Sequence, residues 1–305
     1  MRRTKVLITG SGGFIGSFLS NSLSTDFDVV TWDRNSNFDS CENMTPETDF
    51  GDRLKTIDVI VHCAAVCHRA PSQHVSTLHD SVNYQSTLNF ARQAQESGVR
   101  KFIFLSSVNA VRFDNSDLDS FSVNDNRETY AFFKKKAEIS LQQVNMDTVI
   151  LRLPTVYGPY VKANFRNLIS LIDKGCPLPF GNLERPKKSY LSLYNLSELV
   201  SKVILCNKAS QAIFNVTDNY DISTKMLVNT LCKHLNKKGG NFNAPYRLLV
   251  FLSFVPILGV KLKYFLNSSV SDCTETMEFF NWVPGTTFDR AVEMTVKAYR
   301  DEKND

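Results

Sequence analysis

Three side chains near the middle of the chain have the types and spacing that proton transfer needs. Tyr130 and Lys134 are four residues apart, which places a phenol and an ammonium on one face of a helix. A free phenol has a pKa of about 10 and is a poor base at neutral pH, but a nearby positive charge stabilises the phenolate. Ser107 ends a short apolar run, where its hydroxyl is placed to hydrogen-bond the same substrate oxygen. The set predicts removal of a proton from a substrate hydroxyl.

A cluster of glycines near the start of the chain has the spacing of a phosphate-binding turn. Four of the 13 glycines fall within residues 10–16, directly after an apolar run, and Gly10, Gly13 and Gly16 form a G-x-x-G-x-x-G pattern that opens a helix. A turn this tight needs residues without Cβ, and so does the close approach of backbone N–H groups to a pyrophosphate. The pattern predicts a dinucleotide site.

Asp33 supports the dinucleotide interpretation. It lies 23 residues after Gly10, at the end of the next predicted strand, where a carboxylate accepts hydrogen bonds from a ribose diol. A carboxylate there repels the 2′-phosphate of NADP and favours NAD, whereas the guanidinium of the adjacent Arg34 could bind that phosphate. NAD is therefore the predicted cofactor and NADP the alternative. The cationic nicotinamide would also stabilise a Tyr130 phenolate.

These side chains must be positioned by a sheet. Short runs that are apolar throughout, separated by segments of helical period, are typical of a parallel sheet covered on both faces. The predicted strands are residues 5–9, 28–32, 58–63, 101–106, 148–153 and 212–216. We expect an α/β fold with a doubly wound parallel sheet of the Rossmann type, whose carboxyl edge holds the ligands.

The second half of the chain is less regular. Helical spacing appears near residues 165–174, 196–206 and 224–232. We expect a dinucleotide-binding domain formed by residues 1–159, to which 190–218 return. Residues 160–189 and 219–305 are expected to form a smaller, mostly helical substrate-binding lobe.

Residues 248–260 form the most apolar window. It is 13 residues long and is interrupted by Pro256 and Gly259, so it is too short for the roughly 20 residues that cross a bilayer. A buried helix pair or a subunit contact is expected here, and peripheral contact with a membrane is the alternative.

Composition and charge exclude several classes of protein. A net charge of +4, from 35 basic and 31 acidic residues, gives no nucleic-acid footprint. Seven cysteines, an odd number, together with no secretion pattern at residue 1, favour a cytoplasmic protein with reduced thiols. Cys63, Cys67 and His68 have no second ligand pair at zinc-site spacing, so no metal is expected.

Together these motifs resemble the extended short-chain dehydrogenases/reductases of the nucleotide-sugar epimerase/dehydratase group. The resemblance covers nearly the whole chain. It is carried by residues 9–16, 58–65, 83–87, 104–107, 130–134, 152–159 and 281–284. Residues 161–165, 175–181 and 188–189 resemble a narrower branch, which contains UDP-hexose 4-epimerase-like proteins and 4-keto-6-deoxy-hexosamine reductases.

The resemblance implies roles for further residues. Ser107, Tyr130 and Lys134 would form the catalytic triad, and Tyr130 and Lys134 would also contact the cofactor. The other cofactor-binding residues implied are Gly10, Gly13, Phe14, Ile15, Gly16, Asp33, Arg34, Asn43, Met44, Cys63, Ala64, Ala65, Asn83, Pro154 and Val156. The substrate-binding residues implied are Ser107, Val108, Thr155, Asn164 and Lys188.

The function expected from this set is a nucleotide-sugar 4-epimerase that acts on a UDP-hexose or UDP-N-acetylhexosamine. Tyr130 would take the 4-hydroxyl proton while hydride passes from C4 to NAD and later returns to the opposite face. A UDP-4-keto-6-deoxy-hexosamine 4-reductase that consumes NADH or NADPH would use the same residues. A non-catalytic dinucleotide sensor is a remote third possibility. A homodimer is a family expectation.

Overall fold

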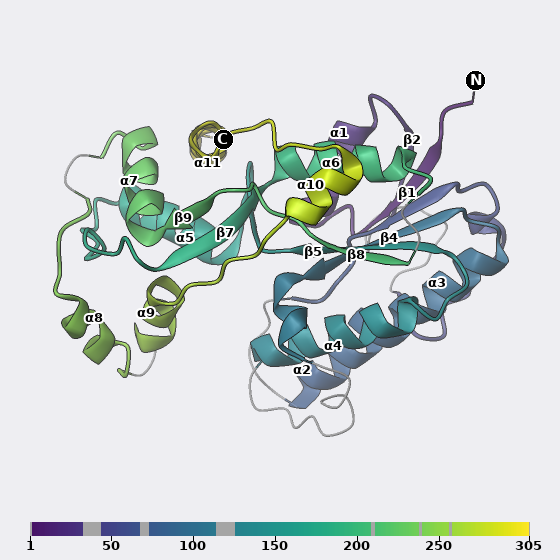
Figure 1. Cartoon of the computed structure of the whole chain (residues 1–305), viewed down its shortest axis with the longest axis horizontal. Helices are drawn as coiled ribbons and strands as arrows, with labels where there is room; N and C mark the ends of the chain where they lie inside the picture. The colour runs from purple at the N-terminus through teal and green to yellow at the C-terminus, as the bar shows by residue number, and fades with distance from the viewer. Residues whose placement is uncertain are drawn as a thin grey trace. The chain divides into compact units, whose positions relative to one another are not determined.

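The structure, a computed structural model, describes residues 2–32, 44–67, 73–113, 126–208, 211–237, 240–255 and 258–304. The chain divides into two compact units (Figure 1). Unit 1 comprises Met1–Leu153, Ser197–Asn215 and Glu275–Trp282. Unit 2 comprises Pro154–Leu196, Val216–Thr274 and Val283–Asp305.

Unit 1 is built on a parallel sheet. Among its described residues, six strands pair in the order β2-β1-β3-β4-β5-β8. The strands are β1 (Lys5–Thr9), β2 (Asp28–Trp32), β3 (Val59–His62), β4 (Lys101–Ser107), β5 (Asp147–Leu153) and β8 (Ala212–Asn215). Leu7 of β1 pairs with Val30 of β2 on one side and with Ile60 of β3 on the other. From β1 the chain therefore adds β2 on one side of the sheet and β3 on the other, so the direction of strand addition reverses between β1 and β3. Ligands bind at such a switch point in doubly wound sheets.

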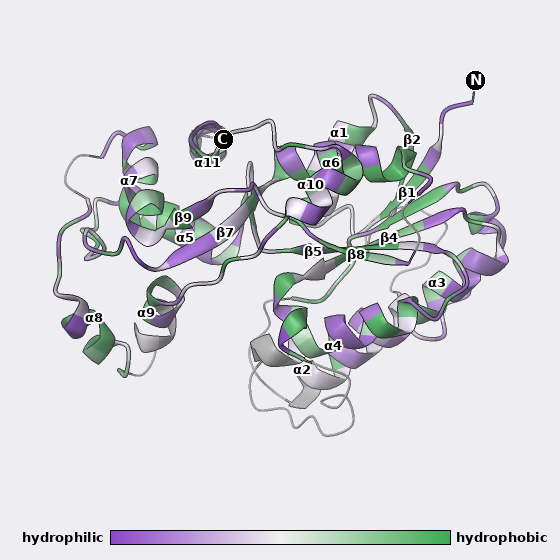
Figure 2. Ribbon diagram, viewed as in Figure 1, coloured by the Kyte–Doolittle hydropathy of each residue, from purple (hydrophilic) through white to green (hydrophobic). Residues whose placement is uncertain are grey.

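Helices cover both faces of this sheet, as the apolar strand runs require. Figure 1 shows α1, α6 and α10 on one face and α2, α3 and α4 on the other, while Figure 2 shows hydrophobic residues along the central strands. The helical segments are α1 (Phe14–Leu23), the 3₁₀ turn η1 (Gly51–Leu54), α2 (Gln73–Leu78), the π-helical η2 (His79–Ser86), α3 (Thr87–Glu96), the 3₁₀ turn η3 (Val108–Arg112), α4 (Asn126–Leu141), α6 (Leu193–Leu205) and α10 (Thr274–Phe280). The predicted doubly wound α/β fold is confirmed.

Aromatic rings fill the core where β2 packs against α3. Trp32 at the end of β2 lies 4.9 Å from Phe50 and 5.7 Å from Phe90, measured between ring centroids. Phe90 belongs to a stripe of α3 that also buries Thr87, Ala91 and Ala94. This spacing of three and four residues is the helical period, and it fixes the face that α3 turns to the sheet.

Unit 2 contains a small sheet that the sequence analysis did not identify. Among the described residues its strands are β6 (Thr155–Tyr157), β7 (Lys187–Ser192) and β9 (Asp221–Ser223), with β6 parallel and β9 antiparallel to β7. The accompanying helices are α5 (Ala163–Asp173), α7 (Thr224–His234), α8 (Tyr246–Leu252), α9 (Leu258–Leu266) and α11 (Phe288–Asn304). Strands of three residues are too short to show a period of their own.

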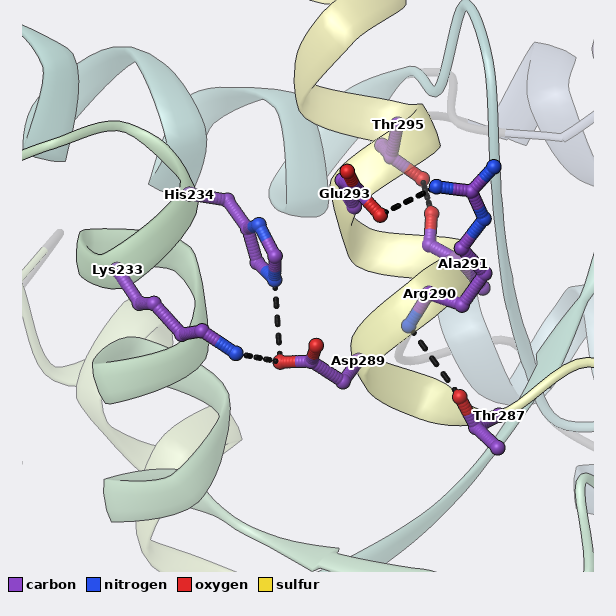
Figure 3. A network of polar contacts seen from close by, with 8 residues as sticks. All are labelled: Lys233, His234, Thr287, Asp289, Arg290, Ala291, Glu293 and Thr295. Atoms are coloured by element: carbon purple, nitrogen blue, oxygen red, sulfur yellow. Dashed lines mark hydrogen bonds and ion pairs between the residues drawn. The ribbon is translucent and has the colours of Figure 1, made fainter.

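Helices α7 and α11 meet through charges that suit their ends. Asp289 lies in the first turn of α11, and its carboxylate accepts from Lys233 Nζ at 2.8 Å and pairs with His234 Nε2 at 3.1 Å, both in the last turn of α7 (Figure 3). The hydrogen bond from Lys233 holds the pKa of Asp289 below its ordinary value. Anions favour helix N-termini and cations favour C-termini. Because Lys233 and Asp289 are largely exposed, their ion pair contributes little to stability.

A buried carboxylate joins the strands of unit 2. Asp218 accepts hydrogen bonds from Tyr157 Oη at 2.9 Å, from the backbone N of Ser192 at 2.9 Å and from Asn195 Nδ2 at 2.7 Å. Asn195 also bonds both the N–H and the carbonyl of Thr286. Burial nevertheless raises the pKa of Asp218 to about 6, against the opposing effect of these donors.

This carboxyl should make the stability of the protein depend on pH. The folded state binds its proton more tightly than the unfolded state, so its contribution is fully present below about pH 4 and is lost as the pH rises through about 6. A difference of about two pKa units corresponds to roughly 3 kcal/mol. Urea unfolding of wild type and Asp218→Asn at several pH values between 4 and 7 measures it. The free-energy difference between the two proteins should change over this range, and parallel curves would contradict the assignment.

The apolar window 248–260 contributes to a helix pair, α8 and α9, as expected, and within one chain this pair is buried on one side only. Leu249 is 1% exposed, whereas Phe251 and Phe254 are 70% and 74% exposed. Hydrophobic spacing predicted the helices, yet nothing in it shows whether the outward side of a pair has a partner. Within the described part of the chain, no helix combines the length and hydropathy needed to span a membrane.

Candidate active site

The glycine turn after β1 is packed against the loop after β3. Gly10 has φ +68°, and a Cβ on it would lie 2.8 Å from the backbone of Ala64. A Cβ on Gly16, in the first turn of α1, would lie 2.2 Å from the carbonyl oxygen of Gly10. Gly13 caps α1 with extended backbone, and its N–H donates to the same carbonyl at 2.9 Å. The chain therefore reverses direction with backbone N–H groups at a helix N-terminus and no side chain filling the turn.

An alanine scan of two glycines tests this packing. Gly16→Ala should lower the free energy of unfolding by roughly 2 kcal/mol, because its Cβ strikes a backbone oxygen that cannot move independently. Gly13→Ala is the matched control: its φ is −84°, and its Cβ would meet only one atom, at 3.0 Å. Urea unfolding followed by tryptophan fluorescence measures both. Equal losses would show that the turn is not closed as described.

A series of buried hydrogen bonds fixes the first residues after β3. The N–H of Ala64 donates to Thr9 Oγ1 at 3.2 Å, which bonds His62 Nδ1 at 2.9 Å, and His62 Nε2 bonds Thr87 Oγ1 at 3.1 Å. His62 is fully buried, and burial lowers its pKa to about 3, with a smaller effect of the Lys134 charge. His62 is thus neutral and holds β1, β3 and α3 together.

Asn83 holds the same loop from the other side. Its Oδ1 accepts from the N–H of Val66 at 2.7 Å, and its Nδ2 donates to the carbonyl of Val66 at 2.9 Å and to His79 Nδ1 at 2.8 Å. The sequence prediction gave Asn83 to the cofactor. These contacts place its fully buried side chain against the backbone that follows Cys63, Ala64 and Ala65, and its role at the cofactor stays a prediction.

The three proton-transfer candidates lie in unit 1. Ser107 is the last residue of β4, is 8% exposed, and accepts from the N–H of Asn109 at 3.2 Å. Tyr130 and Lys134 lie one turn apart on α4, and Lys134 Nζ is 5.9 Å from the centre of the Tyr130 ring. Lys134 Nζ also donates to the carbonyl of Leu105 at 2.8 Å and lies 4.3 Å from the centre of the Phe104 ring. The lysine thereby links α4 to the strand that ends at Ser107.

Burial sets the protonation of this pair. Lys134 is 2% exposed, and burial lowers its pKa to about 8, although Cys67, Cys63 and Glu138 oppose the shift. Burial also raises the pKa of the Tyr130 phenol above its ordinary value, and the nearby Cys67 raises it further. Burial raises the pKa of Cys63 to about 12. The protein alone thus keeps Tyr130 protonated, and a base at this position requires additional positive charge.

A buried ion pair between Glu138 and Arg152 lies next to the catalytic candidates. Glu138 lies one turn after Lys134 on α4 and is fully buried. Its carboxylate accepts from Arg152 of β5 at 2.5 and 3.0 Å and from Ser106 Oγ of β4 at 2.5 Å. Ser106 adjoins Ser107. The sequence analysis missed Glu138, for which the only signal was its helical spacing of four from Lys134.

The substrate candidates of unit 2 gather around a residue that the sequence did not indicate. Thr155 Oγ1 lies 3.3 Å from the hydroxyl of Tyr264, a residue of α9. Lys188 is 9% exposed, and its Nζ lies 4.1 Å from the centre of the Tyr264 ring. Asn164 is exposed in the first turn of α5. Thr155, Lys188 and Tyr264 are thus one cluster, whereas Asn164 has no described contact with it.

The other predicted site residues have simpler places. Phe14 and Ile15 form the first turn of α1, and Val108 directly follows Ser107 in η3. Pro154 follows β5, and Val156 pairs with Leu191 in the sheet of unit 2. Met44 packs against the aromatic core, and its carbonyl accepts from Ser86 Oγ. Asp33, Arg34 and Asn43 lie outside the described residues, and among the described ones no group of three metal-binding side chains occurs.

Comparison with known proteins supports the resemblance seen in the motifs. Residues 6–184 match the family model described as "NAD dependent epimerase/dehydratase family". A Vibrio cholerae protein named UDP-glucose 4-epimerase is 33% identical to this chain, and the match covers 98% of this chain and 96% of that protein. An Escherichia coli O157:H7 protein named N-acetyl-alpha-D-glucosaminyl-diphospho-ditrans,octacis-undecaprenol 4-epimerase is 27% identical over 80% of this chain and 76% of its own length.

The fold is shared with solved enzymes as well. UDP-glucuronic acid 4-epimerase from Bacillus cereus, solved in complex with NAD, superposes with a TM-score of 0.75 at 17% identity, covering 98% of this chain and 99% of that one. The family model spans more than half of the chain, and the Vibrio cholerae relative aligns along nearly all of it. The chain therefore belongs to the NAD-dependent epimerase/dehydratase family of extended short-chain dehydrogenases/reductases.

Proposed function

We propose that this protein is an NAD-dependent nucleotide-sugar 4-epimerase that oxidises C4 of a UDP-hexose or UDP-N-acetylhexosamine transiently and reduces it again on the opposite face. The observation that carries the proposal is the link in unit 1 between Lys134, Tyr130 and the strand ending at Ser107. The names of the Vibrio cholerae relative and the Bacillus cereus neighbour, both UDP-sugar 4-epimerases, support the substrate class.

The glycine turn fits a dinucleotide. Cβ atoms on Gly10 and Gly16 would strike neighbouring backbone, so the turn closes only with glycine there, as a dinucleotide-binding turn requires. Gly10, Gly13, Phe14, Ile15 and Gly16 would hold the pyrophosphate with their backbone. Bound there, NAD would supply the hydride acceptor and donor and a positive charge near Tyr130. Asp33 would accept hydrogen bonds from the ribose diol and favours NAD over NADP, with Arg34 as the residue that could reverse this preference.

Each catalytic residue has a distinct role in this proposal. Tyr130 accepts the proton of the 4-hydroxyl and later returns it. Ser107 hydrogen-bonds the same oxygen as its charge develops. Lys134, held by the Leu105 carbonyl, keeps a positive charge one helical turn from the phenol and would also hold the nicotinamide ribose. Val108 lies beside Ser107 at the sugar.

The diphosphate of the substrate is assigned to unit 2. Lys188 supplies an ammonium, which neutralises phosphate charge but does not form a bidentate fork. Thr155 supplies a hydroxyl within the same cluster, and Tyr264 orients both of these residues. Asn164, exposed at the start of α5, would add an amide.

Analysis of the purified protein tests the proposal. NAD should remain bound, as shown by mass spectrometry of the extract after denaturation. UDP-glucose or UDP-N-acetylglucosamine should convert to its C4 epimer without added cofactor. A protein free of NAD that leaves these sugars unchanged would contradict the epimerase. Stoichiometric consumption of NADPH with a 4-keto sugar would assign the same residues to a reductase.

Two expectations belong to the same proposal. We place the protein in the cytoplasm, consistent with thiols rather than disulfides at Cys63, Cys67, Cys176, Cys206, Cys232 and Cys273 among the described residues. We also propose a homodimer, which sedimentation equilibrium would measure directly.

A further inference from the structure

The outward side of the α8–α9 hairpin is an apolar surface. Leu248, Phe251, Phe254 and Val255 are 49%, 70%, 74% and 42% exposed. Leu248, Phe251 and Phe254 follow one another at intervals of three, and Val255 lies four residues after Phe251. Hydrogen bonds from the N–H of Phe254 to the carbonyl of Phe251 and from the N–H of Val255 to the carbonyl of Leu252 continue the turns of α8. We call these four side chains the hairpin face. Figure 2 shows that α8 is hydrophobic after a polar start.

The other side of the hairpin is anchored in unit 2. Leu249, Leu262 and Leu266 are buried, and Thr224 Oγ1 donates to the carbonyl of Phe265 at 2.8 Å. The ring of Phe265 lies 4.9 Å from that of the buried Phe180. The hairpin thus buries one apolar side and still presents a second.

A glycine at the start of α9 allows close packing against the end of α8. A Cβ on Gly259 would lie 2.1 Å from the carbonyl oxygen of Ser253, and the N–H of Gly259 donates to Val255 at 2.7 Å. The start of α9 is therefore held against the end of α8. The exposed aromatic side chains sit on a fixed support rather than on a loose loop.

The sequence segment that contains the hairpin has charged residues of one sign. Between Asp221 and Asp272 the sequence has seven Lys and Arg residues and no Asp or Glu, so this segment carries more net positive charge than the whole chain. Lys225, Lys233 and Lys237 pair with carboxylates from elsewhere in unit 2. Arg247 adjoins the hairpin face at Leu248 and is exposed, and Lys263 Nζ lies 5.8 Å from the centre of the Phe254 ring.

We propose that the hairpin face binds the surface of an anionic lipid bilayer. An amphipathic element with exposed Phe and Leu, flanked by Lys and Arg and free of acidic residues, inserts its apolar side to headgroup depth while its cations reach lipid phosphates. The hairpin does not have the length to span the bilayer. A second copy of the chain is disfavoured as occupant, because a symmetric contact through this face brings Arg247 and Lys263 toward like charges.

Docking there would hold the candidate substrate cluster near the lipid surface. Lys263 contacts the hairpin face, and the next residue, Tyr264, contacts Thr155 and Lys188. Helix α9 thus contacts the hairpin face and also contributes to the cluster of Thr155, Lys188 and Tyr264. Membrane docking through the hairpin face does not depend on the proposed epimerase activity.

Vesicle sedimentation of the full chain tests the proposal. The protein should sediment with vesicles of phosphatidylcholine mixed with phosphatidylglycerol, and more weakly with phosphatidylcholine alone. Phe251→Ser/Phe254→Ser should lower the partition coefficient at least about tenfold, because the two exposed rings that would enter the bilayer are lost. Lys263→Gln should lower it about fivefold, and added salt should weaken binding. Leu205→Ser/Val283→Ser, which changes residues 64% and 68% exposed outside the hairpin, should bind like wild type.

Two outcomes would overturn the assignment. One is absence of binding to the anionic vesicles, or equal binding by wild type and the double phenylalanine variant. The other is a dimer that Phe251→Ser/Phe254→Ser dissociates while vesicle binding is absent, which would make a second copy the occupant. Since all substituted side chains are exposed, unchanged thermal unfolding verifies that each variant is folded. The vesicle readout is independent of turnover, so failure of the proposed function leaves this test intact.

Discussion

Tyr130→Phe is expected to lower turnover about 10²–10⁴-fold while NAD stays bound. The substitution removes only the phenolic oxygen, the group that would accept and return the 4-hydroxyl proton. The ring remains on α4 one turn from Lys134, whose ammonium lies 5.9 Å from its centre. The cofactor turn lies on α1 and β1, so its glycines are untouched. Turnover with UDP-hexoses and the NAD content after purification measure the two effects separately.

A matched control and two outcomes sharpen this prediction. Tyr220→Phe removes a phenolic oxygen from a side chain that is 58% exposed in unit 2, and it should leave turnover unchanged. If Tyr130→Phe retains wild-type turnover, Tyr130 is not the acid and base. If wild type itself has no turnover but binds NAD, the chain is a dinucleotide sensor rather than an enzyme.

Glu138→Gln is expected to lower the free energy of unfolding by about 3–5 kcal/mol. Glu138 is fully buried, and its carboxylate accepts from Arg152 and Ser106. The glutamine has a similar shape, but it leaves the largely buried guanidinium of Arg152 without a counter-charge. Removing one member of a buried ion pair costs more than the pair contributes, because the remaining charge stays desolvated. Urea unfolding at neutral pH measures the loss.

Two further variants separate the buried charge from loss of packing. Glu138→Gln/Arg152→Met removes both charges and should recover most of the stability. Glu293→Gln breaks an exposed ion pair with Arg290 on α11 and should cost less than about 1 kcal/mol. Losses of similar size for Glu138→Gln and Glu293→Gln would show that Glu138 is not a buried counter-charge. Because Ser106 and Lys134 adjoin this pair, Glu138→Gln should also lower turnover.

Much of unit 1 could be predicted from local sequence. The apolar runs indicated each strand of its sheet to within one or two residues, since a strand buried on both faces must be apolar throughout. Phe14–Leu23 was predicted as the helix after the glycines and is α1. These properties depend on residues a few positions apart, so their pattern is visible without a fold.

The site was predicted only in part. Their spacing in the sequence predicted that Tyr130 and Lys134 lie close together, because four residues make about one helical turn. It did not show that Lys134 donates to Leu105 or that burial lowers its pKa to about 8. Nor did it show that the amide of Asn83, a residue predicted to lie along the cofactor, holds the backbone of Val66. A motif names a residue, but the contacts of its side chain depend on neighbours brought by packing.

The sequence by itself determined the strand and helix periods, the glycine turn and the phenol–ammonium pair, because each is encoded within one element or one turn. Only the tertiary structure decided which positions distant in sequence meet. Tyr264 reaches Thr155 across 109 positions, and Asp218 gathers donors from β6 and β7. It also decided that the aromatic side chains of α8 are uncovered. An apolar residue has the same transfer free energy wherever it stands, and only packing determines whether protein covers it.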